Sequence, residues 1–536
     1  MIKKIILSIL AAAVLCSAWG QSRATPPRIV VNIVVGAMRS GDIERYRENF
    51  SSDGFLRLLD GGVNYKSASY NLHQTITPAT LSTIFTGTLP STHGVVGEEW
   101  WEYTLGSRVD LVADREVRNL DYNLRDWGYS ASKLVAPTLS EALLLANPNS
   151  KSVSIAVEPT SAIVMNGRGG VPYWIDSLTC EWGSSTAFVD SLSRRVVEYN
   201  KSPEMQAPLR QKWVSMLTPN FYKNGVSTAL MLKSPTRRYE AAELPRTKSR
   251  DDRRRLMYEQ LAYTPAGNSV IFNYAKELIE SMDLGGDEHP DILNIYLDPA
   301  RNIAQRYGVQ SIEVEDMYLH LDAEIRAFVA MLAARMHVGD MVITLTSDHG
   351  ISAVCDESQM FNTQQFVMLI GGFLRAQYGV GNWVLGYKNC NLYLNHQLIL
   401  EQGLSISDIQ DEVAAFALQF RGVSHVLTAS AMRSGYFGGG YGQKMQSSFS
   451  PSRSGDVVLN FMPGWIEQRE GVVANSGSMY RYDNDVPLII YATGYSVSDS
   501  VSRDVSMIDF ATTLSSILNI EPPAAAEGRV LNEFAE

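Results

Sequence analysis

The chain has 536 residues, a formal net charge of −11, 45% hydrophobic residues and 19% charged residues. This composition excludes a disordered chain, which would be poorer in apolar residues, and four cysteines are too few for a disulfide-scaffold protein. The excess of acidic over basic residues argues against a nucleic-acid-binding protein, because such a protein needs a basic surface.

The first 20 residues have the three parts of a secretory signal peptide. Two lysines precede an apolar run over residues 5–15, and the small residues Ala18 and Gly20 stand just before a cleavage site. The apolar run is too short to span a bilayer. We therefore expect residues 1–20 to be a signal peptide, the alternative being a membrane anchor. The mature protein is then periplasmic or secreted and has no transmembrane segment.

Three cysteines remain after cleavage and allow at most one internal disulfide: Cys180, Cys355 and Cys390.

Beyond this leader, short apolar segments alternate with segments of helical periodicity. The segment 28–35 (RIVVNIVV) is almost continuously β-branched, which is typical of a strand buried on both faces of a parallel sheet. The alternation of strands and helices indicates an α/β fold with a mainly parallel central sheet. The further predicted strands are 152–157, 291–297, 341–345 and 486–491, and the predicted helices are 54–59, 133–146, 315–336 and 507–518.

Two long stretches interrupt this alternation. Residues 166–285 are rich in aromatic residues and glycine, and residues 355–455 contain three consecutive glycines and a serine-rich segment. We interpret both as insertions that form a cap beside the sheet. The first contains a charged run, residues 246–255. Because Asp251 and Asp252 lie inside this run, we favour a solvated loop over a polyanion-binding site.

Four segments carry the strongest functional signal. They are IVVGAMR at residues 33–39, TITPATLSTIFTGTLPSTHGVVG at 75–97, ITLTSDHG at 343–350 and DNDVPLIIYATG at 483–494. In sequence and order they resemble the alkaline phosphatase superfamily, above all the exported phosphatases with a threonine nucleophile and the related nucleotide pyrophosphatase/phosphodiesterases. Residues 452–465 and 507–520 extend the resemblance. It implies a three-layer alkaline-phosphatase-like domain over residues 21–536, with a mainly parallel central sheet and an inserted cap.

Members of this superfamily hydrolyse phosphate esters with two metal ions, usually zinc, and a metal-bound threonine or serine nucleophile. The resemblance places the nucleophile at Thr77. It places two ligands of the first ion at Asp348 and His349, in an intact Asp-His-Gly turn. The remaining ligand of that ion should be an aspartate directly after the first strand, where this chain has Gly36.

The ligands expected for the second ion are missing. When the segment before position 308 is aligned on its terminal Tyr-Gly pair, Arg301 and Gln305 stand at the positions of an aspartate and a histidine. The third ligand should be a histidine near the C-terminus, but Asp485 stands there, and His425 is the last histidine of the chain. The resemblance therefore implies no complete second metal site.

Arg301 suggests a replacement for the second ion. Its guanidinium could supply the charge of a cation at that position and pair with Asp348 or Asp485. An alternative register, which starts at Asp298, puts Asn302 at the histidine position and so supplies no histidine either.

The groups that would hold a phosphate also differ from the family pattern. Glu98 stands where the family has a polar contact, usually asparagine. Glu158 and Thr160 stand where the phosphatases with a threonine nucleophile have a Lys-x-Arg pair. A carboxylate in place of a cation would repel a phosphoryl group.

Several of these residues also have structural interpretations. Thr77 could be a helix N-cap with Pro78 as the first helical residue, which we favour over a nucleophile. Asp348 and His349 could form a hydrogen-bonded pair at a strand end, which we favour over a metal site. We expect Cys355 to be a buried structural cysteine rather than a further ligand.

Two hypotheses for the function follow. In the first, the chain is an exported pseudoenzyme of the alkaline phosphatase superfamily that binds an unidentified cell-envelope protein or ligand and holds no metal, or at most one divalent ion such as zinc. The alternative is a metal-dependent phosphomonoesterase or phosphodiesterase with one ion on Thr77, Asp348 and His349, with Asp485 or Asp298 as a further ligand. A nucleic-acid or membrane-surface module is disfavoured by the acidic charge.

Overall fold

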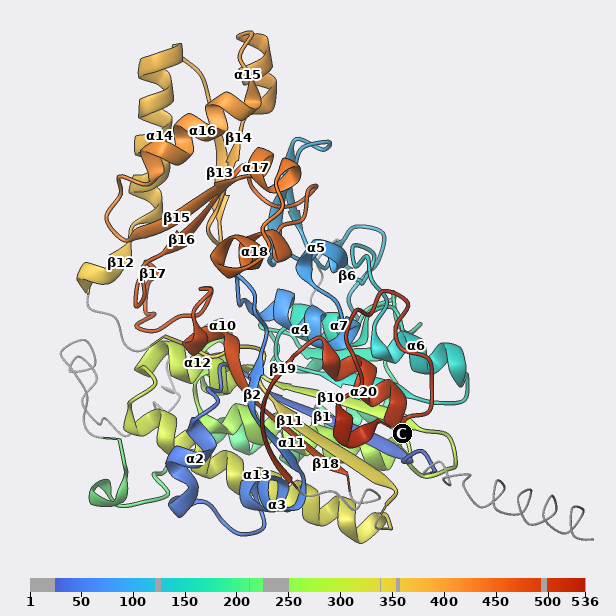
Figure 1. The fold of residues 1–536 in the computed structure, drawn as a ribbon. Helices are drawn as coiled ribbons and strands as arrows, with labels where there is room; N and C mark the ends of the chain where they lie inside the picture. The colour runs from blue at the N-terminus through green and yellow to red at the C-terminus, as the bar shows by residue number, and fades with distance from the viewer. Residues whose placement is uncertain are drawn as a thin grey trace, which may run out of the picture.

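A large β-sheet forms the centre of the structure, a computed structural model that describes residues 25–120, 127–211, 213–224, 250–337, 339–352, 357–492 and 499–535 (Figure 1). The predicted signal peptide and Cys355 lie outside these residues. Within them, no helix has both the length and the apolar character that crossing a bilayer requires. Cys180 and Cys390 are buried free thiols.

Most neighbouring strands of the central sheet run parallel. β1 pairs in parallel with β10 and β11, β10 with β7, β7 with β8, and β19 with β2. Antiparallel pairs place β18 between β11 and β2 and put β9 at the far edge. This confirms the predicted α/β fold with a mainly parallel sheet. Over the described residues, the strand order is β19 (Asp499–Ser506), β2 (Val63–Ser69), β18 (Asp485–Ala492), β11 (Met341–Thr346), β1 (Ile29–Val35), β10 (Asp291–Leu297), β7 (Ser152–Ile155), β8 (Val171–Ile175) and β9 (Trp182–Gly183).

Strand β1 shows why the sheet needs a layer of helices on each face. All seven of its residues are buried. Val31 and Ile33 belong to one hydrophobic cluster, whereas Val30 and Val34 belong to the other. Because successive side chains of a strand point to opposite faces, an apolar strand of this kind must be covered on both sides.

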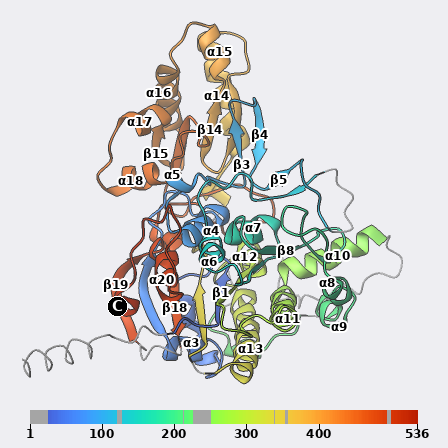
Figure 2. The ribbon, with the colours of Figure 1, turned by 90° about the vertical axis from the view of Figure 1, so that its right-hand side faces the viewer.

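The helices form these two covering layers, so the fold has the three layers that the sequence predicts. Figure 2 shows α4, α6 and α20 on one side of β1 and α11 and α13 on the other. One layer consists of α3 (Phe55–Gly61), α10 (Arg250–Tyr263), α11 (Pro265–Ser281), α12 (Asp298–Tyr307) and α13 (Ile312–Arg335). The other consists of α4 (Thr77–Thr86), α6 (Leu139–Ala146), α7 (Pro159–Asn166) and α20 (Asp509–Ile517).

Two predicted elements differ from the structure. Helix α6 begins at Leu139 rather than at residue 133, because Thr138 and Glu141 form a capping box that fixes its start. The solvated loop predicted for residues 246–255 is wrong from residue 250 onward, where α10 begins. This helix contacts α12 and α11, so tertiary packing overrides the loop-like charge pattern.

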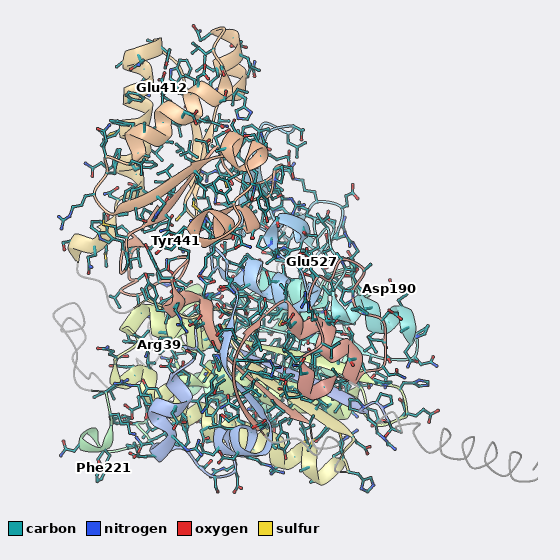
Figure 3. The ribbon with its side chains drawn as sticks, in the orientation of Figure 1. Arg39, Asp190, Phe221, Glu412, Tyr441 and Glu527 are labelled. Atoms are coloured by element: carbon teal, nitrogen blue, oxygen red, sulfur yellow. The ribbon has the colours of Figure 1, made fainter. Side chains whose placement is uncertain are left out.

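A second, smaller sheet lies above the main one and has its own hydrophobic core (Figure 1). We call the large sheet with its helices the main unit and the smaller sheet with its helices the second unit. Figure 3 labels Arg39, beside α2 (Asp42–Tyr46) of the main unit, and Glu412, on α16 (Ile406–Ala417) of the second unit. The strand order of the smaller sheet is β13 (Val384–Lys388), β14 (Asn391–Leu394), β16 (Val457–Phe461) and β15 (Val423–Thr428). Helices α14 (Thr363–Tyr378), α15 (His396–Glu401), α16 (Ile406–Ala417), α17 (Ala429–Ser434) and α18 (Gly440–Ser447) accompany it.

The two stretches that the sequence suggests as cap insertions occupy different places. Residues 355–455 supply most of the second sheet and its helices, as far as they are described. Residues 166–285 contribute β8 and β9 to the main sheet and α11 to a helix layer. The division into one domain with two insertions stays a prediction.

A hairpin of the main unit is fastened to the second sheet. It consists of β3 (Glu99–Glu102) and β4 (Ser107–Asp110), and its Tyr103 hydroxyl donates to Asp456. The Tyr103 ring stacks on His396 with 4.1 Å between ring centroids. Asp456 is buried and also accepts hydrogen bonds from the Leu394 amide at 2.7 Å and from His396 at 2.7 Å. The two units are therefore joined by a buried carboxylate with several partners.

Candidate active site

Parallel strands bring the residues with functional motifs to one edge of the main sheet. Because β1, β10 and β11 run in register, their carboxyl ends lie together. Asp348 and His349 follow β11, Arg301 lies on α12 after β10, and Thr77 begins α4. Thr77, Arg301 and His349 line one cleft with an empty volume of about 710 Å³, together with Glu98 and Glu158.

Asp348 is the buried acceptor at the centre of this group. Its Oδ2 accepts from the Thr77 hydroxyl at 2.7 Å and from the Tyr296 hydroxyl at 2.7 Å. Its Oδ1 accepts from the Ala37 and His349 amides, each at 2.9 Å. Burial raises the pKa of Asp348, but the charge and hydrogen bond of His349 more than offset this and hold the pKa well below its usual range. The carboxylate is therefore ionised.

His349 directs one ring nitrogen into the site. Nδ1 lies 2.6 Å from the Gly350 carbonyl, which only accepts hydrogen bonds, so Nδ1 carries a proton. Nε2 lies 3.0 Å from Asp348 Oδ2 and 3.3 Å from Thr77 Oγ1. Burial lowers the pKa of His349, but the Asp348 carboxylate outweighs burial and raises it above its usual value. The imidazole thus shares its Nε2 between a carboxylate and a hydroxyl.

The guanidinium of Arg301 reaches the same hydroxyl. Nη1 donates to Thr77 Oγ1 at 2.9 Å, and Nη2 donates to Glu158 at 2.8 Å. Arg301 is only 8% exposed. Burial lowers the pKa of this guanidinium, but Glu158 and other acidic neighbours, Asp348 among them, raise it above its usual value. Arg301 and Asp348 both contact Thr77 Oγ1 and the Tyr296 hydroxyl, but among the described residues the ion pair of Arg301 is with Glu158, so the predicted pairing with Asp348 is not direct.

Gly36 stands against Arg301 and Tyr296. A Cβ at position 36 would lie 2.8 Å from Arg301 Cβ, 2.9 Å from the Leu297 carbonyl oxygen and 3.0 Å from the Tyr296 hydroxyl. Real Cβ atoms do not approach other heavy atoms at 2.8 Å. The aspartate that the family pattern expects here has no room while Arg301 and Tyr296 keep their positions.

The predicted N-cap role of Thr77 is wrong. Ile76 is the N-cap of α4 and makes no side-chain capping bond, while Thr77 already lies within the helix, with a proline at its start. The Thr77 hydroxyl donates to Asp348 instead of accepting from the first helical amides. The backbone therefore leaves this hydroxyl free to face the site.

Of two other predicted positions, Glu98 lines the cleft and Asp485 does not. Glu98 is exposed and lines the cleft. Asp485 lies outside it: its carboxylate accepts from Arg481 Nε at 2.7 Å and lines a separate surface cavity with Arg39. The structure thus brings Arg301 to Asp348 and Thr77 but not to Asp485.

The alternative register is not supported by the position of Asp298. Its carboxylate is buried and accepts from the Val157 amide at 2.7 Å. Burial and the nearby Glu158 raise the pKa of Asp298 well above its usual value. Gln305, by contrast, lines the cleft and donates to Asn475 at 3.0 Å.

Several cleft residues have no signal in the sequence. Tyr296 lies in the apolar strand β10, where a tyrosine is expected to be a core residue. Ser476 lies 3.3 Å from His349 Nε2, in a segment without a recognisable motif. Lys388, Asn389 and Arg469 reach the cleft from the second sheet and its neighbourhood.

The donors present fit one metal ion better than two. Thr77, Asp348 and His349 offer a hydroxyl, a carboxylate and an imidazole that face one another, and this donor set suits a divalent ion such as zinc. The position of the second ion holds Arg301 and Gln305, which supply a cation and an amide. Across the described residues, no group of three or more His, Cys, Asp or Glu side chains could hold a metal ion. Thr77, Asp348 and His349 therefore offer donors for at most one ion, with fewer charged ligands than a metal site usually has, and the second position offers none.

Comparison with known proteins places these features in a family. Residues 30–473 match the family model of type I phosphodiesterase / nucleotide pyrophosphatase. A protein of Myroides odoratus named calcium-transporting ATPase is 26% identical over 527 residues, or 95% of both chains. Alkaline phosphatase PafA of Elizabethkingia meningoseptica is 24% identical over 544 residues, which cover 99% of this chain and 98% of that protein.

The fold agrees with a solved structure over nearly the whole chain. The crystal structure of wild-type alkaline phosphatase PafA superposes with a TM-score of 0.85 at 24% identity. The superposition covers 95% of this chain and 99% of that one. Both units of the present structure therefore have counterparts in that fold.

Proposed function

Because the chain belongs to the type I phosphodiesterase / nucleotide pyrophosphatase family, within the alkaline phosphatase superfamily, we propose that it is an exported phosphohydrolase with a reduced metal site. Its substrates would be phosphate monoesters or diesters. The observation that carries the proposal is the 2.9 Å contact between Arg301 Nη1 and Thr77 Oγ1, which places a fixed positive charge beside the nucleophile position. Nearly full-length relatives named as alkaline phosphatases favour this hypothesis over the pseudoenzyme.

Arg301 would bind and orient the phosphoryl group. A guanidinium presents several N–H donors in a fixed plane, which suits phosphate oxygens. Glu158 holds Nη2 and so fixes the side chain in the cleft, while Nη1 lies next to Thr77. The positive charge of Arg301 would take over part of the role that a second ion has elsewhere in the family.

Thr77 would attack phosphorus through its hydroxyl oxygen. The hydroxyl donates to Asp348 Oδ2 at 2.7 Å, which orients its oxygen. An ion held by Thr77, Asp348 and His349 would supply further positive charge and lower the pKa of the hydroxyl, so that its proton passes to water. A bond forms between phosphorus and the threonine oxygen, the bond from phosphorus to the ester oxygen breaks, and the alcohol takes a proton from water. A water molecule then cleaves the phosphothreonine and releases the phosphate group.

A second candidate is the exported binding protein that lacks turnover. It is favoured by one observation, the absence of room for a side chain at position 36. In this case the cleft would recognise a phosphate ester or an unidentified cell-envelope partner, with Arg301 as the anion-binding group. Glu98 and Glu158, which line the same cleft, would limit how tightly a dianion binds.

Metal analysis combined with an activity assay separates the two candidates. Purified mature protein would be loaded with zinc, its metal content measured, and turnover followed with nitrophenyl phosphate and bis-nitrophenyl phosphate. The phosphohydrolase is expected to bind about one ion per chain and to lose activity in Thr77→Ala, whereas Thr77→Ser retains a nucleophile and serves as the matched variant. Binding of phosphate esters without turnover would identify the binding protein. A protein that neither binds nor hydrolyses these esters would overturn the phosphohydrolase and any role in binding phosphate esters.

A further inference from the structure

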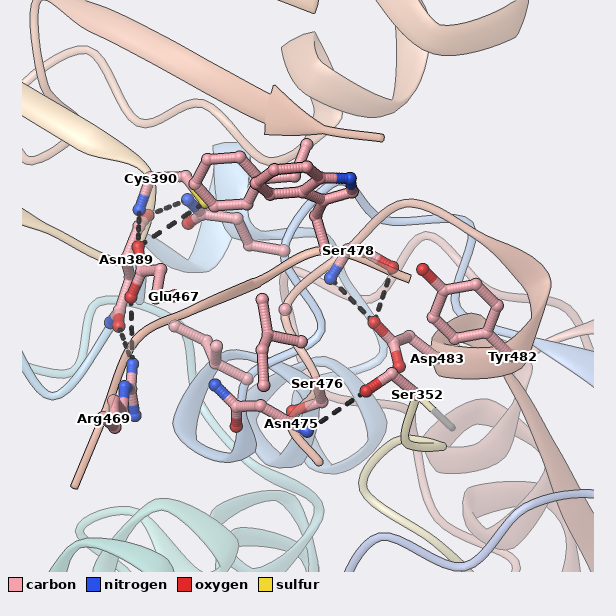
Figure 4. Close-up of a pocket in the computed structure, with 16 residues that line it drawn as sticks. Ser352, Asn389, Cys390, Glu467, Arg469, Asn475, Ser476, Ser478, Tyr482 and Asp483 are labelled. Carbon is pink, nitrogen blue, oxygen red and sulfur yellow. Dashed lines mark hydrogen bonds and ion pairs between the residues drawn. The ribbon is translucent and has the colours of Figure 1, made fainter. Parts of the chain in front are cut away.

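A second cavity adjoins the cleft around Thr77. It is small and is shown in Figure 4. The two spaces share a wall, which consists of Ile76, Asn389, Arg469, Asn475 and Ser476. Ile76 precedes Thr77, and Ser476 lies 3.3 Å from His349 Nε2. A ligand whose phosphoryl group lies at Thr77 could therefore extend its other end into this cavity.

A buried carboxylate oxygen in this cavity has no partner. Asp483 lines the cavity and is 1% exposed. Its Oδ2 accepts from the Ser478 amide at 2.9 Å and from the Ser478 hydroxyl at 2.5 Å, as the dashed lines in Figure 4 mark. Its Oδ1 is buried and has no hydrogen-bond partner among the described residues. Buried polar atoms are almost always paired, so this oxygen lacks a donor that a ligand can supply.

The walls of the cavity favour a cationic donor. Three aromatic residues line it, Phe461, Trp465 and Tyr482, and aromatic faces attract cations. A second carboxylate, Glu467, also lines it. Its Oε1 accepts from Tyr387 at 2.8 Å, so it is already partly satisfied. Glu467 Oε2 lies 3.2 Å from Arg469 Nη2, so Glu467 is paired with a cation, and Asp483 is the lining carboxyl group without one among the described residues.

We propose that this cavity binds an ammonium group on the alcohol part of the ester, so that the preferred ligand is a phosphate ester of a small amino alcohol. The ammonium donates to Asp483 Oδ1 and contacts the aromatic wall, while the phosphoryl group lies beside Arg301 and Thr77. This assignment rests on the proposed phosphate-ester specificity of the cleft and adds the substrate class. If the cavity instead holds a hydroxyl group of a ligand, or only ordered water, the protein would not prefer amino-alcohol esters.

Binding measurements test the assignment independently of turnover. Dissociation constants of the zinc-loaded full mature chain would be measured by calorimetry in a Thr77→Ala background, which lacks the nucleophile and to which the further variants are compared. The ligands are 2-aminoethyl phosphate, 3-aminopropyl phosphate and the matched ethyl and propyl phosphates. We expect at least one amino ester to bind about tenfold or more tightly than its alkyl counterpart, because a charge-assisted hydrogen bond in a buried site is strong. Asp483→Asn is expected to bring this ratio close to one while alkyl phosphate binding stays unchanged.

Matched variants separate the cavity from general effects of charge. Asp485→Asn removes a carboxylate two residues away that lies outside the cavity, and it should keep the preference for the amino ester. If Asp483→Asn does not fold, Trp465→Leu tests the aromatic wall and should lower the ratio several-fold. A ratio close to one in the Thr77→Ala protein without a further substitution, or a preference for glycerol phosphate over both amino esters, overturns the assignment. Absence of binding by all the esters overturns the proposed function as well, whereas binding of alkyl phosphates alone overturns only the assignment.

Discussion

Gly36 and Arg301 are packed so closely that position 36 has no room for a side chain: a Cβ on Gly36 would stand 2.8 Å from Arg301 Cβ. In the family pattern, position 36 carries a metal-binding aspartate, and Arg301 occupies the position of another. The contact is made by the Cβ of residue 301, which every residue except glycine has, so it reflects how closely the backbone after β1 approaches α12. The guanidinium of Arg301 separately supplies a cation at the position where the family pattern has a metal ligand.

The first prediction concerns this contact. Gly36→Ala should lower the free energy of unfolding by about 1–3 kcal/mol, because an added methyl group forces a well-packed neighbourhood apart. Gly41→Ala lies in the same loop with nothing within 4 Å of the new Cβ, and it should be close to neutral. Chemical denaturation of the two variants measures the difference. Equal stability would show that Arg301 and Tyr296 move aside without cost.

The second prediction concerns Arg301 as the anion-binding group. Arg301→Ala should weaken binding of inorganic phosphate by about 10- to 100-fold, because a charged hydrogen-bond donor is lost from a buried site. Arg306→Ala is the matched variant on the same helix. Its guanidinium stacks on Tyr263 at 4.7 Å. Calorimetric titration with phosphate provides the readout, and an unchanged affinity in Arg301→Ala would place the anion elsewhere.

The third prediction concerns the carboxylate that holds Arg301. Glu158→Gln should tighten phosphate binding by about fivefold to tenfold, because it removes a negative charge from the cleft while keeping a hydrogen-bond acceptor for Nη2. Glu44→Gln, in a different cavity, controls for net charge and should have no effect. Weaker binding in Glu158→Gln would mean that the position of the guanidinium matters more than the local charge.

The fourth prediction concerns the single metal ion. Zinc at a hundredfold excess over its dissociation constant should stabilise the protein by about 2.7 kcal/mol, and a chelator should reverse the effect. Asp348→Asn keeps the shape of the side chain and should abolish the stabilisation, whereas Asp485→Asn should retain it. Thermal melts with zinc and with chelator show this directly. Stabilisation that persists in Asp348→Asn would point to a different zinc site.

The fifth prediction concerns the pH dependence of stability without ligand. Burial raises the pKa of Asp483 from 3.8 to about 7. Between these values the folded state binds more protons than the unfolded state, so this group lowers the stability as pH rises from about 4 to about 7. The loss is on the order of 4 kcal/mol. Asp483→Asn should lack this slope, and its stability relative to the unsubstituted protein should increase with pH. Denaturation curves at pH 4, 5.5 and 7 measure it, with Asp485→Asn expected to follow the unsubstituted protein.

The sequence predicts the framework of the site because its motifs are local. The strand at residues 28–35 and the Asp-His-Gly turn are short segments whose structure follows from their own residues. Arg301 could be located through the resemblance, by aligning its segment on the Tyr-Gly pair at positions 307 and 308. Position 485 differs, because the direction of its side chain depends on how β18 begins and on the exposed Arg481 four residues before it.

The rest of the site arises from contacts between distant segments. Tyr296 resembles a core residue in sequence, and only the packing of β10 beside Asp348 turns its hydroxyl into a partner of the site. Asp483 begins one of the four segments that resemble the family, but its unpaired oxygen has no signal in the sequence, because it follows from the burial of Oδ1 in the folded chain. The charged residues from position 250 onward form helix α10, because this segment packs against α11 and α12, which lie later in the chain.

The hydrogen bond from Tyr103 to Asp456 joins the two sheets and bears on which substitutions the cleft can accept. Thr77 begins α4, which covers the main sheet, whereas Lys388 ends β13 and Asn389 follows it in the separate sheet with its own core; all three line the same cleft. Substitutions in that smaller sheet could therefore change the lining of the cleft without altering Thr77, as long as the contact between Tyr103 and Asp456 is kept. The position of Thr77 and part of the wall that a ligand would contact therefore lie in two separately packed parts of the protein.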